Sequence, residues 1–248
     1  MKRFALVFGL AAIVLVFAGH AALAQTVSID LGGGGSSTGR IVQLVVLVTV
    51  LSLAPAILVM VTSFTRIVVV LSFLRSALGT QQAPPNMVLV SLALFLTGFV
   101  MSPVFETAWR DGVQPLMENR IDEMEAFTRT AEPFRTFMMT QVRTEDLELF
   151  TNLARGEPPA NPQVVPYTTL VPAFMISELR RAFEIGFLIF LPFLIIDMVV
   201  SSILMSMGMM MLPPVMVSLP FKLIFFVLVD GWQLVAGSLV QSFGTVGG

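Results

Sequence analysis

The sequence predicts an all-α membrane protein built from long hydrophobic helices and helical hairpins. Hydrophobic residues make up 56% of its 248 residues and charged residues only 12%, which is more apolar surface than a soluble domain of this length can bury. Several apolar runs approach or exceed the roughly 18 residues needed to cross a bilayer. The one long polar stretch between them has helical periodicity, so the predicted fold is helical throughout.

The N-terminal residues 1–24 have the pattern of a cleaved signal peptide. A positively charged start precedes an apolar core from Phe4 to Ala18, and small residues lead to a predicted cleavage between Ala24 and Gln25. Cleavage would place the new N-terminus outside the cytoplasm. The alternative is an uncleaved first transmembrane helix. Residues 25–40 follow as a Gly/Ser-rich linker.

Four apolar segments follow the linker. They are predicted at Ile41 to about Thr62, Met87 to about Phe105, about Ile185 to Met207, and about Pro214 to Ala236. The first two form a group of N-terminal hydrophobic helices, 41–105, and the last two a C-terminal helical hairpin, 184–248. The first helix can continue through the amphipathic stretch Phe64 to Gly79. Arg66 and Arg75, without a nearby acid, favour a cytoplasmic loop by the positive-inside rule.

A helical insert, 106–183, separates the two apolar groups, and the same topology makes it periplasmic. From Glu106 to Glu157 it holds eleven acids and six arginines, net −5. One predicted helix has an apolar stripe of Phe134, Phe137 and Met138 that ends at Gln141. A second begins at the candidate N-cap Thr144, ends before Gly156, and has a stripe of Leu147, Phe150 and Ala154. The insert is either a small self-packed domain or an oligomer contact.

Two charges lie inside the C-terminal apolar segments. Asp197 and Lys222 are almost equally far along the chain from the centre of the methionine run between these segments. An antiparallel hairpin would therefore bring them to the same height, and an unpaired charge in a bilayer is costly. We expect them to pair, within one chain or between neighbours. The alternative is that Lys222 reaches an interface while Asp197 meets water.

A second charged cluster, Glu178, Arg180, Arg181 and Glu184, lies at the entrance to the third segment. Helical spacing predicts a pair between Glu178 and Arg181 and another between Arg180 and Glu184. These pairs either solubilise the entrance or contribute to contacts between subunits.

Met209, Met210 and Met211 lie in the short loop between the last two apolar segments. Gly208 lets the chain bend, and Pro213 and Pro214 stop the preceding helix. Methionine is flexible and fills irregular gaps, so the run is either ordinary loop packing or, in a ring of copies, a deformable apolar seal across a pore.

The residue types exclude most enzyme classes. The chain has no cysteine, and its one histidine, His20, lies in the predicted signal peptide. Thiol catalysis, cysteine zinc sites and triads that use histidine are therefore excluded from the mature chain. We expect no enzyme activity, no catalytic residue, no metal and no cofactor.

Beyond the linker, nearly all of the chain resembles the FliP/SctR family of type III export gates. The resemblance is carried by FTRIVVVLSFLRSALGTQQAPPNMVL, LALFLTGFVMSP and VPAFMISELRRAFEIGFLIFLPFLIIDMVVSSILMSMGMMMLPPVMVSLPFKLIFFVLVDGWQLV. These are long, specific matches. The signal sequence and the long acidic insert look more like the flagellar branch than the injectisome branch.

The resemblance implies a pore-forming subunit in the bacterial inner membrane, at the flagellar basal body. Members form a pentameric, conical ring with FliQ and FliR, assisted by FliO, beside FlhB and FlhA and fed by the flagellar ATPase complex. Unfolded flagellar subunits pass through it. The family's seal maps onto the methionine run, its membrane charges onto Asp197 and Lys222, and its subunit contacts onto Phe137, Phe150 and Glu178, to which the charged cluster adds Arg181.

Two other functions stay open at this stage. One is an assembly scaffold that nucleates FliQ and FliR without forming the constriction. The other is an intramembrane enzyme or proton channel that uses Asp197 and Lys222.

Overall fold

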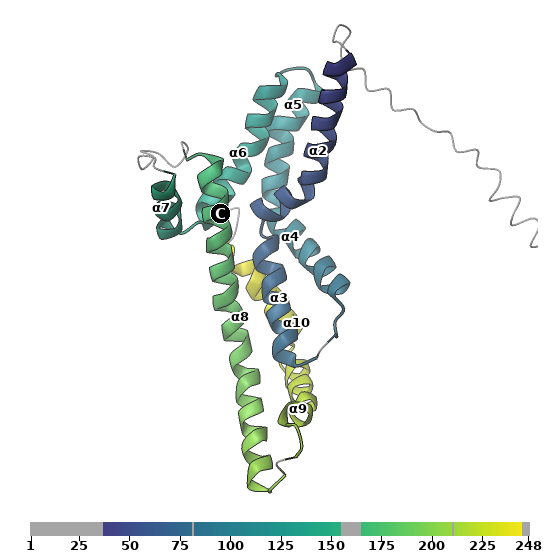
Figure 1. The fold of residues 1–248 in the computed structure, drawn as a ribbon, viewed down its shortest axis with the longest axis vertical. Coiled ribbons are helices and arrows are strands. Elements are labelled where there is room, and N and C mark those ends of the chain that lie inside the picture. Colours follow the sequence, from purple (N-terminus) through teal and green to yellow (C-terminus); the bar gives the residue numbers. More distant parts are fainter. Residues whose placement is uncertain (1–36, 81, 155–164, 210, 245–248) are drawn as a thin grey trace, which may run out of the picture. The chain divides into compact units, whose positions relative to one another are not determined.

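The computed structural model describes residues 37–80, 82–154, 165–209 and 211–244, and within these ranges it contains helices and no strand (Figure 1). The predicted all-α class is therefore confirmed. The chain divides into two compact units, residues 1–52 and residues 53–248. The predicted cleavage site at Ala24 and Gln25 lies outside the described residues, as does most of the predicted linker.

A sharp bend separates the first two helices, α2 (Ser37–Val61) and α3 (Phe64–Leu78). The last turns of α2 and the whole of α3 meet at 82°. Side-chain hydroxyls replace backbone bonds at the break: Thr62 Oγ1 accepts from the Phe64 N–H at 3.4 Å, and Thr65 Oγ1 donates to the Val59 carbonyl at 3.1 Å. The expected continuation of one helix through Phe64 to Gly79 is therefore wrong, because threonine hydroxyls compete with the helical ladder here.

The second apolar helix continues into the predicted insert. Helix α4 (Asn86–Ala108) is followed without a break by the π-helical turn η1 (Trp109–Val113) and by α5 (Gln114–Met117). Gly112 allows η1 to approach α6, since an added Cβ would lie 2.8 Å from the backbone nitrogen of Thr130. The predicted division between residues 105 and 106 therefore falls inside a helix.

The insert contains two further helices, α6 (Glu123–Gln141) and α7 (Thr144–Leu153). Asp122 caps α6 by accepting the Glu125 N–H at 2.7 Å. The predicted apolar stripe of α6 is confirmed, because Phe137, Met138 and Gln141 are buried. Helix α7 has Arg143 rather than the predicted Thr144 at the N-cap position.

The C-terminal half is a hairpin of α8 (Tyr167–Ser206) and α9 (Pro214–Leu228), followed by α10 (Gly231–Gln241). Helix α8 has 40 residues and begins well before the predicted boundary at residue 184. Helices α9 and α10 are bent by 64° where the fourth apolar segment had been expected to be one helix. Asp230 occupies the bend in the left-handed region, with φ of 54°.

Helix α3 lies at the centre of the unit formed by residues 53–248. Its Arg66 end meets Glu178 of α8 and Ser242 after α10, and its Ala77 end meets Lys222 of α9. Helix α8 therefore runs parallel to α3, while α9 and α10 run antiparallel to it (Figure 1). The buried side of α3 contributes six apolar residues to the core: Ile67, Val70, Leu71, Leu74, Ala77 and Leu78.

Long apolar faces are left exposed by the residues that the structure describes. Phe95 and Phe99 of α4 are 80% and 71% exposed, and α8 and α9 expose further large apolar side chains. By length and composition, the helices Asn86–Met117 and Tyr167–Ser206 can each span a membrane, and the two bent pairs raise the total to four among the described residues. These surfaces suit lipid or other subunits rather than water.

Candidate functional site

An ion pair joins the two arms of the C-terminal hairpin. Lys222 Nζ on α9 donates to Asp197 Oδ2 on α8 at 2.6 Å, and Ser218 Oγ donates to Asp197 Oδ1 at 2.6 Å. Lys222 also donates to the carbonyl of Ala77 at 3.1 Å. The structure therefore brings the two predicted charges together within one chain and adds two partners that the sequence did not reveal.

The position of Lys222 follows from the end of α3. The last carbonyls of a helix lack intrahelical donors and carry partial negative charge. Ala77 presents one of them, and Gly79 ends the helix in the left-handed conformation with φ of 75°. Lys222 is 3% exposed, so its charge is satisfied by Asp197 and Ala77 rather than by solvent at an interface.

The methionine loop begins at a defined helix stop. The Gly208 N–H donates to Met205 O and the Met209 N–H to Leu204 O, both near 3 Å, with Gly208 at φ of 74°. This pair of bonds is a Schellman motif, which glycine at the left-handed position favours. Pro214 then opens α9, where its missing N–H costs nothing.

The loop presents methionine to its surroundings. Met211 is 99% exposed and Met207 64%, whereas Met209 is partly buried. Met210 lies outside the described residues. The tip of the hairpin therefore carries apolar side chains that the described part of the chain does not cover, at the end of the 40-residue helix α8 (Figure 1).

A second ion pair is fully buried at the other end of α3. Arg66 Nε donates to Glu178 Oε2 at 2.8 Å, and Nη2 donates to Glu178 Oε1, so the pair is bidentate. Arg66 Nη1 donates to the Ser242 carbonyl at 2.9 Å, and Nη2 donates to Gln141 Oε1 at 3.1 Å. The guanidinium carbon lies 3.8 Å from the centre of the Phe243 ring.

This cluster corrects two predictions. Arg66 is a buried residue of α3 and not a loop cation, so Arg75 alone is left as the orientation signal. The expected Glu178–Arg181 pair is wrong, because both carboxylate oxygens of Glu178 bind Arg66. A signal was present in the sequence: Arg66 lies in the apolar run TRIVVVLSFL, where a charge needs a partner as much as Asp197 does.

The other predicted pair of that cluster is present, and it is exposed. Arg180 Nε lies 3.0 Å from Glu184 Oε1, with both side chains more than half exposed. Arg181 turns toward the insert instead and donates to Gln141 Oε1 at 3.3 Å.

The residues predicted to contact other subunits divide into two groups. Phe137 and Glu178 are buried inside the chain, and Phe137 packs against Phe174 and Phe243. Their side chains therefore offer no surface to a neighbour in this conformation. Phe150 and Arg181 are partly exposed. The predicted subunit contact stays a proposal for all four residues.

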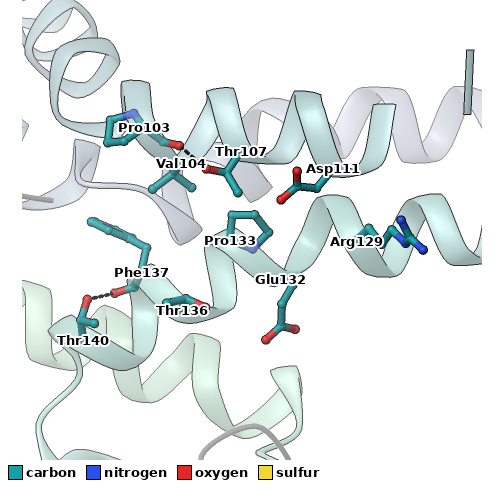
Figure 2. Close-up of a pocket in the computed structure, with 10 residues that line it drawn as sticks. All are labelled: Pro103, Val104, Thr107, Asp111, Arg129, Glu132, Pro133, Thr136, Phe137 and Thr140. Atoms are coloured by element: carbon teal, nitrogen blue, oxygen red, sulfur yellow. Dashed lines mark hydrogen bonds between the residues drawn. The ribbon is translucent and has the colours of Figure 1, made fainter. Parts of the chain in front are cut away.

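A groove of about 490 Å³ lies between α4 with η1 and α6. Figure 2 shows Pro133 and Phe137 of α6 opposite Val104 and Thr107 of α4, with Asp111 beyond them. The charged groups on its rim are already paired with neighbours on their own elements: Asp111 with Arg110, Arg129 with Glu125, and Glu132 with Arg135. Within the described residues, the groove therefore has no free charged group with which to orient a ligand.

No metal or catalytic centre emerges from the part of the chain that the structure describes. Within it, no three histidine, cysteine, aspartate or glutamate side chains gather as a metal site would require. The chemistry available is packing, ion pairing and an exposed apolar tip.

Comparison with known proteins identifies close relatives. A model of the FliP family matches residues 47–239. Flagellar biosynthetic protein FliP of Caulobacter vibrioides is 58% identical over 244 residues, 98% of this chain and 92% of that protein. The proteins of the same name from Bacillus subtilis and Pectobacterium carotovorum are 58% and 54% identical, over 82% and 95% of this chain and 91% and 92% of theirs.

Proposed function

The chain belongs to the FliP family, and from this premise we propose that it is a pore-forming subunit of the flagellar type III protein export gate. It conducts unfolded flagellar subunits across the bacterial inner membrane, with Met209, Met210 and Met211 as the seal. The observation that carries this proposal is the exposed methionine tip of the α8–α9 hairpin, because a 99% exposed Met211 has no partner surface within the described residues of its own chain.

The geometry supports a seal that is both firm and deformable. The hairpin arms are fixed below the loop by the Asp197–Lys222 pair and by the Lys222 bond to α3. The loop itself has a glycine stop at one end and two prolines at the other. Copies arranged in a ring would bring several such tips together, and flexible thioether side chains can close around a polypeptide of any sequence.

The partners in this proposal follow from the family resemblance. The chain forms a pentameric, conical ring at the flagellar basal body with FliQ and FliR, assembles with help from FliO, and works beside FlhB and FlhA. The exposed apolar faces of α4, α8 and α9 support such contacts, because they would otherwise need lipid over their whole length.

The deciding experiment measures inner-membrane leakage of a small ion in cells whose chain carries glycine at Met209, Met210 and Met211. Ring assembly is verified first by purification of the complex. We expect leakage to rise, whereas leucine at the same three positions preserves most of the barrier. Met198→Ala serves as the matched control, since Met198 is 62% exposed but lies on the side of α8. An assembled and tight glycine ring would instead favour the assembly scaffold.

The enzyme or proton channel alternative receives less support from the geometry. Both carboxylate oxygens of Asp197 accept hydrogen bonds, and Lys222 is bound to Asp197 and to a backbone carbonyl. Groups that are hydrogen-bonded in this way hold α3, α8 and α9 together. Moving a proton through Asp197 or Lys222 would break these hydrogen bonds.

A further inference from the structure

Ser242 and Phe243, which follow α10, occupy a built site at the junction of α3, α6 and α8. Arg66 supplies the donors, with its Nη1 bound to the Ser242 carbonyl at 2.9 Å and to Ser242 Oγ at 3.1 Å. Gln141 Nε2 donates to the Phe243 carbonyl at 3.1 Å. Phe243 is 3% exposed. Its ring lies next to the Arg66 guanidinium and stacks with the Phe137 ring, 6.3 Å away by centroids.

We propose that Ser242 and Phe243 are an anchoring segment, that Arg66, Gln141 and Phe137 form its binding site, and that its docking completes the protomer. The ligand is defined by its chemistry: two backbone carbonyls, a hydroxyl and an aromatic ring. Arg66 binds the carbonyl and the hydroxyl of Ser242, and Gln141 binds the carbonyl of Phe243. Arg66 and Phe137 both pack against the Phe243 ring, so the segment is held by more than apolar packing.

The reason that docking matters is the buried charge of Arg66. Glu178 accepts hydrogen bonds from Nε and Nη2 of Arg66. Within the described residues, Nη1 donates only to the carbonyl and the hydroxyl of Ser242. A fully buried guanidinium with an unpaired nitrogen is strongly unfavourable. Without the segment, Arg66 must stay near water, and the α3–α8 interface around it cannot close.

The anchoring segment is synthesised after the residues that bind it, so only a chain that includes Ser242 and Phe243 can complete this site. Arg66 and Ser242 are 176 positions apart, whereas Arg66 and Glu178 are 112 apart. Synthesis proceeds from the N-terminus, so Arg66 and Glu178 are both present in the chain before Ser242 is. A chain that ends early keeps an open α3–α8 junction, and only a chain that reaches Phe243 can close it.

The sequence contains no cysteine, so a single introduced cysteine can be labelled without background from other thiols. Ala182 is fully buried on α8, one turn from Glu178, so Ala182→Cys introduces a single thiol whose labelling rate reports opening of this junction. The full chain in membranes is compared with chains ending at Gln241 and at Gly244. We expect labelling of the Gln241 chain to be roughly tenfold faster or more, because the junction is open, and the Gly244 chain to be protected like the full chain.

A single substitution provides a second test if the chain ending at Gln241 does not accumulate in the membrane. Phe243→Ala removes the ring over Arg66, and Phe226→Ala is its control, because Phe226 is similarly buried but packs at the α9–α10 bend. We expect faster labelling of the introduced thiol in the first variant and not in the second. Equal labelling in both would overturn the proposal, since it would reduce the segment to general packing.

Replacing the Arg66–Glu178 ion pair by apolar residues tests whether the effect of Phe243 depends on the buried charge or only on apolar packing. In a chain with Arg66→Met and Glu178→Leu, the buried ion pair is replaced by apolar groups of similar size. We expect Phe243→Ala to accelerate labelling far less in this background than in the original one, as a coupled pair of sites requires. The same acceleration in both backgrounds, or protection of the introduced thiol in the chain ending at Gln241, would contradict the anchoring site.

Discussion

At the scale of residues, the protein uses its few buried charges as connectors between helices. Lys222 is bound to a carboxylate and to a carbonyl in the last turn of α3, and Arg66 is bound to a carboxylate and to the carbonyl of Ser242. Each cation therefore has one ionic partner and one backbone partner. Such a group is hard to replace, because its removal leaves at least a carboxylate and a backbone carbonyl without their donor in an environment of low polarity.

Lys222→Met is expected to destabilise the protein by about 2–4 kcal/mol, somewhat less than for a fully buried pair because Asp197 is a quarter exposed. The loss leaves the Asp197 carboxylate without its cation. The double variant Asp197→Asn with Lys222→Met removes both charges, and we expect it to regain at least half of the loss. Unfolding of the purified protein in detergent measures both. A double variant less stable than Lys222→Met would contradict this account.

Exchange of the two charges would be a misleading control. Lys222→Asp combined with Asp197→Lys preserves the pair but places a carboxylate against the Ala77 carbonyl, at the negative end of α3. We therefore expect the exchanged chain to remain defective even though the native residues form a pair.

At the scale of elements, α3 is fixed at both ends and closely packed between them. Arg66 marks its first turn and Ala77 its last, and each lies at one of the two ion pairs. Between them α8 approaches closely at Gly186, where an added Cβ would lie 2.7 Å from Cγ and 3.1 Å from Cβ of Phe73. The α3–α8 contact therefore depends on a glycine as well as on charges.

Gly186→Ala is expected to cost about 1–2 kcal/mol, because overpacking outweighs the better helix propensity of alanine. Phe73 cannot relieve the clash by rotation of its ring alone, since its Cβ is also close. Gly98→Ala on α4 is the matched control, with no atom within 4 Å of the new methyl group. Thermal unfolding in detergent should rank Gly186→Ala below the original protein and Gly98→Ala at or above it. The reverse order would disprove the close contact.

At the scale of the whole molecule, the distribution of exposed apolar residues separates two kinds of surface. Helices α4, α8 and α9 expose continuous apolar faces, whereas exposed apolar residues of α6, such as Phe127, lie among charges. The first kind of surface requires lipid or other subunits, and the second can remain in water.

Phe95→Arg tests this difference, because Phe95 is 80% exposed on the apolar helix α4. A central arginine there costs about 3 kcal/mol of membrane insertion, so we expect a clear loss of membrane-integrated chain after alkaline extraction. Phe127→Arg, at 70% exposure on α6, should leave integration unchanged. Similar behaviour of the two variants would show that α4 does not face a bilayer.

The sequence alone predicted much of the secondary structure and part of the site. Apolar length and composition indicated the helical class, and the equal spacing of Asp197 and Lys222 about the loop placed them opposite each other. The continuous helix through Thr62 and Ser63 was a wrong prediction, because side-chain hydroxyls break the ladder there. The prediction that Arg66 lies in a cytoplasmic loop was wrong, because the sequence pattern of a cation near the end of an apolar segment is the same whether the cation faces water or a buried acid.

What the sequence by itself determined about this protein is therefore local: where apolar helices form, where glycine and proline stop them, and which residues carry charge. Only the tertiary structure decided that Arg66 pairs with Glu178, that Lys222 binds a carbonyl in the last turn of α3, and that Phe243 packs against Arg66. The physical reason is that helix formation depends on neighbours within a few positions. The partner of a buried charge, in contrast, depends on which distant surfaces meet, here across 112 to 176 positions of chain.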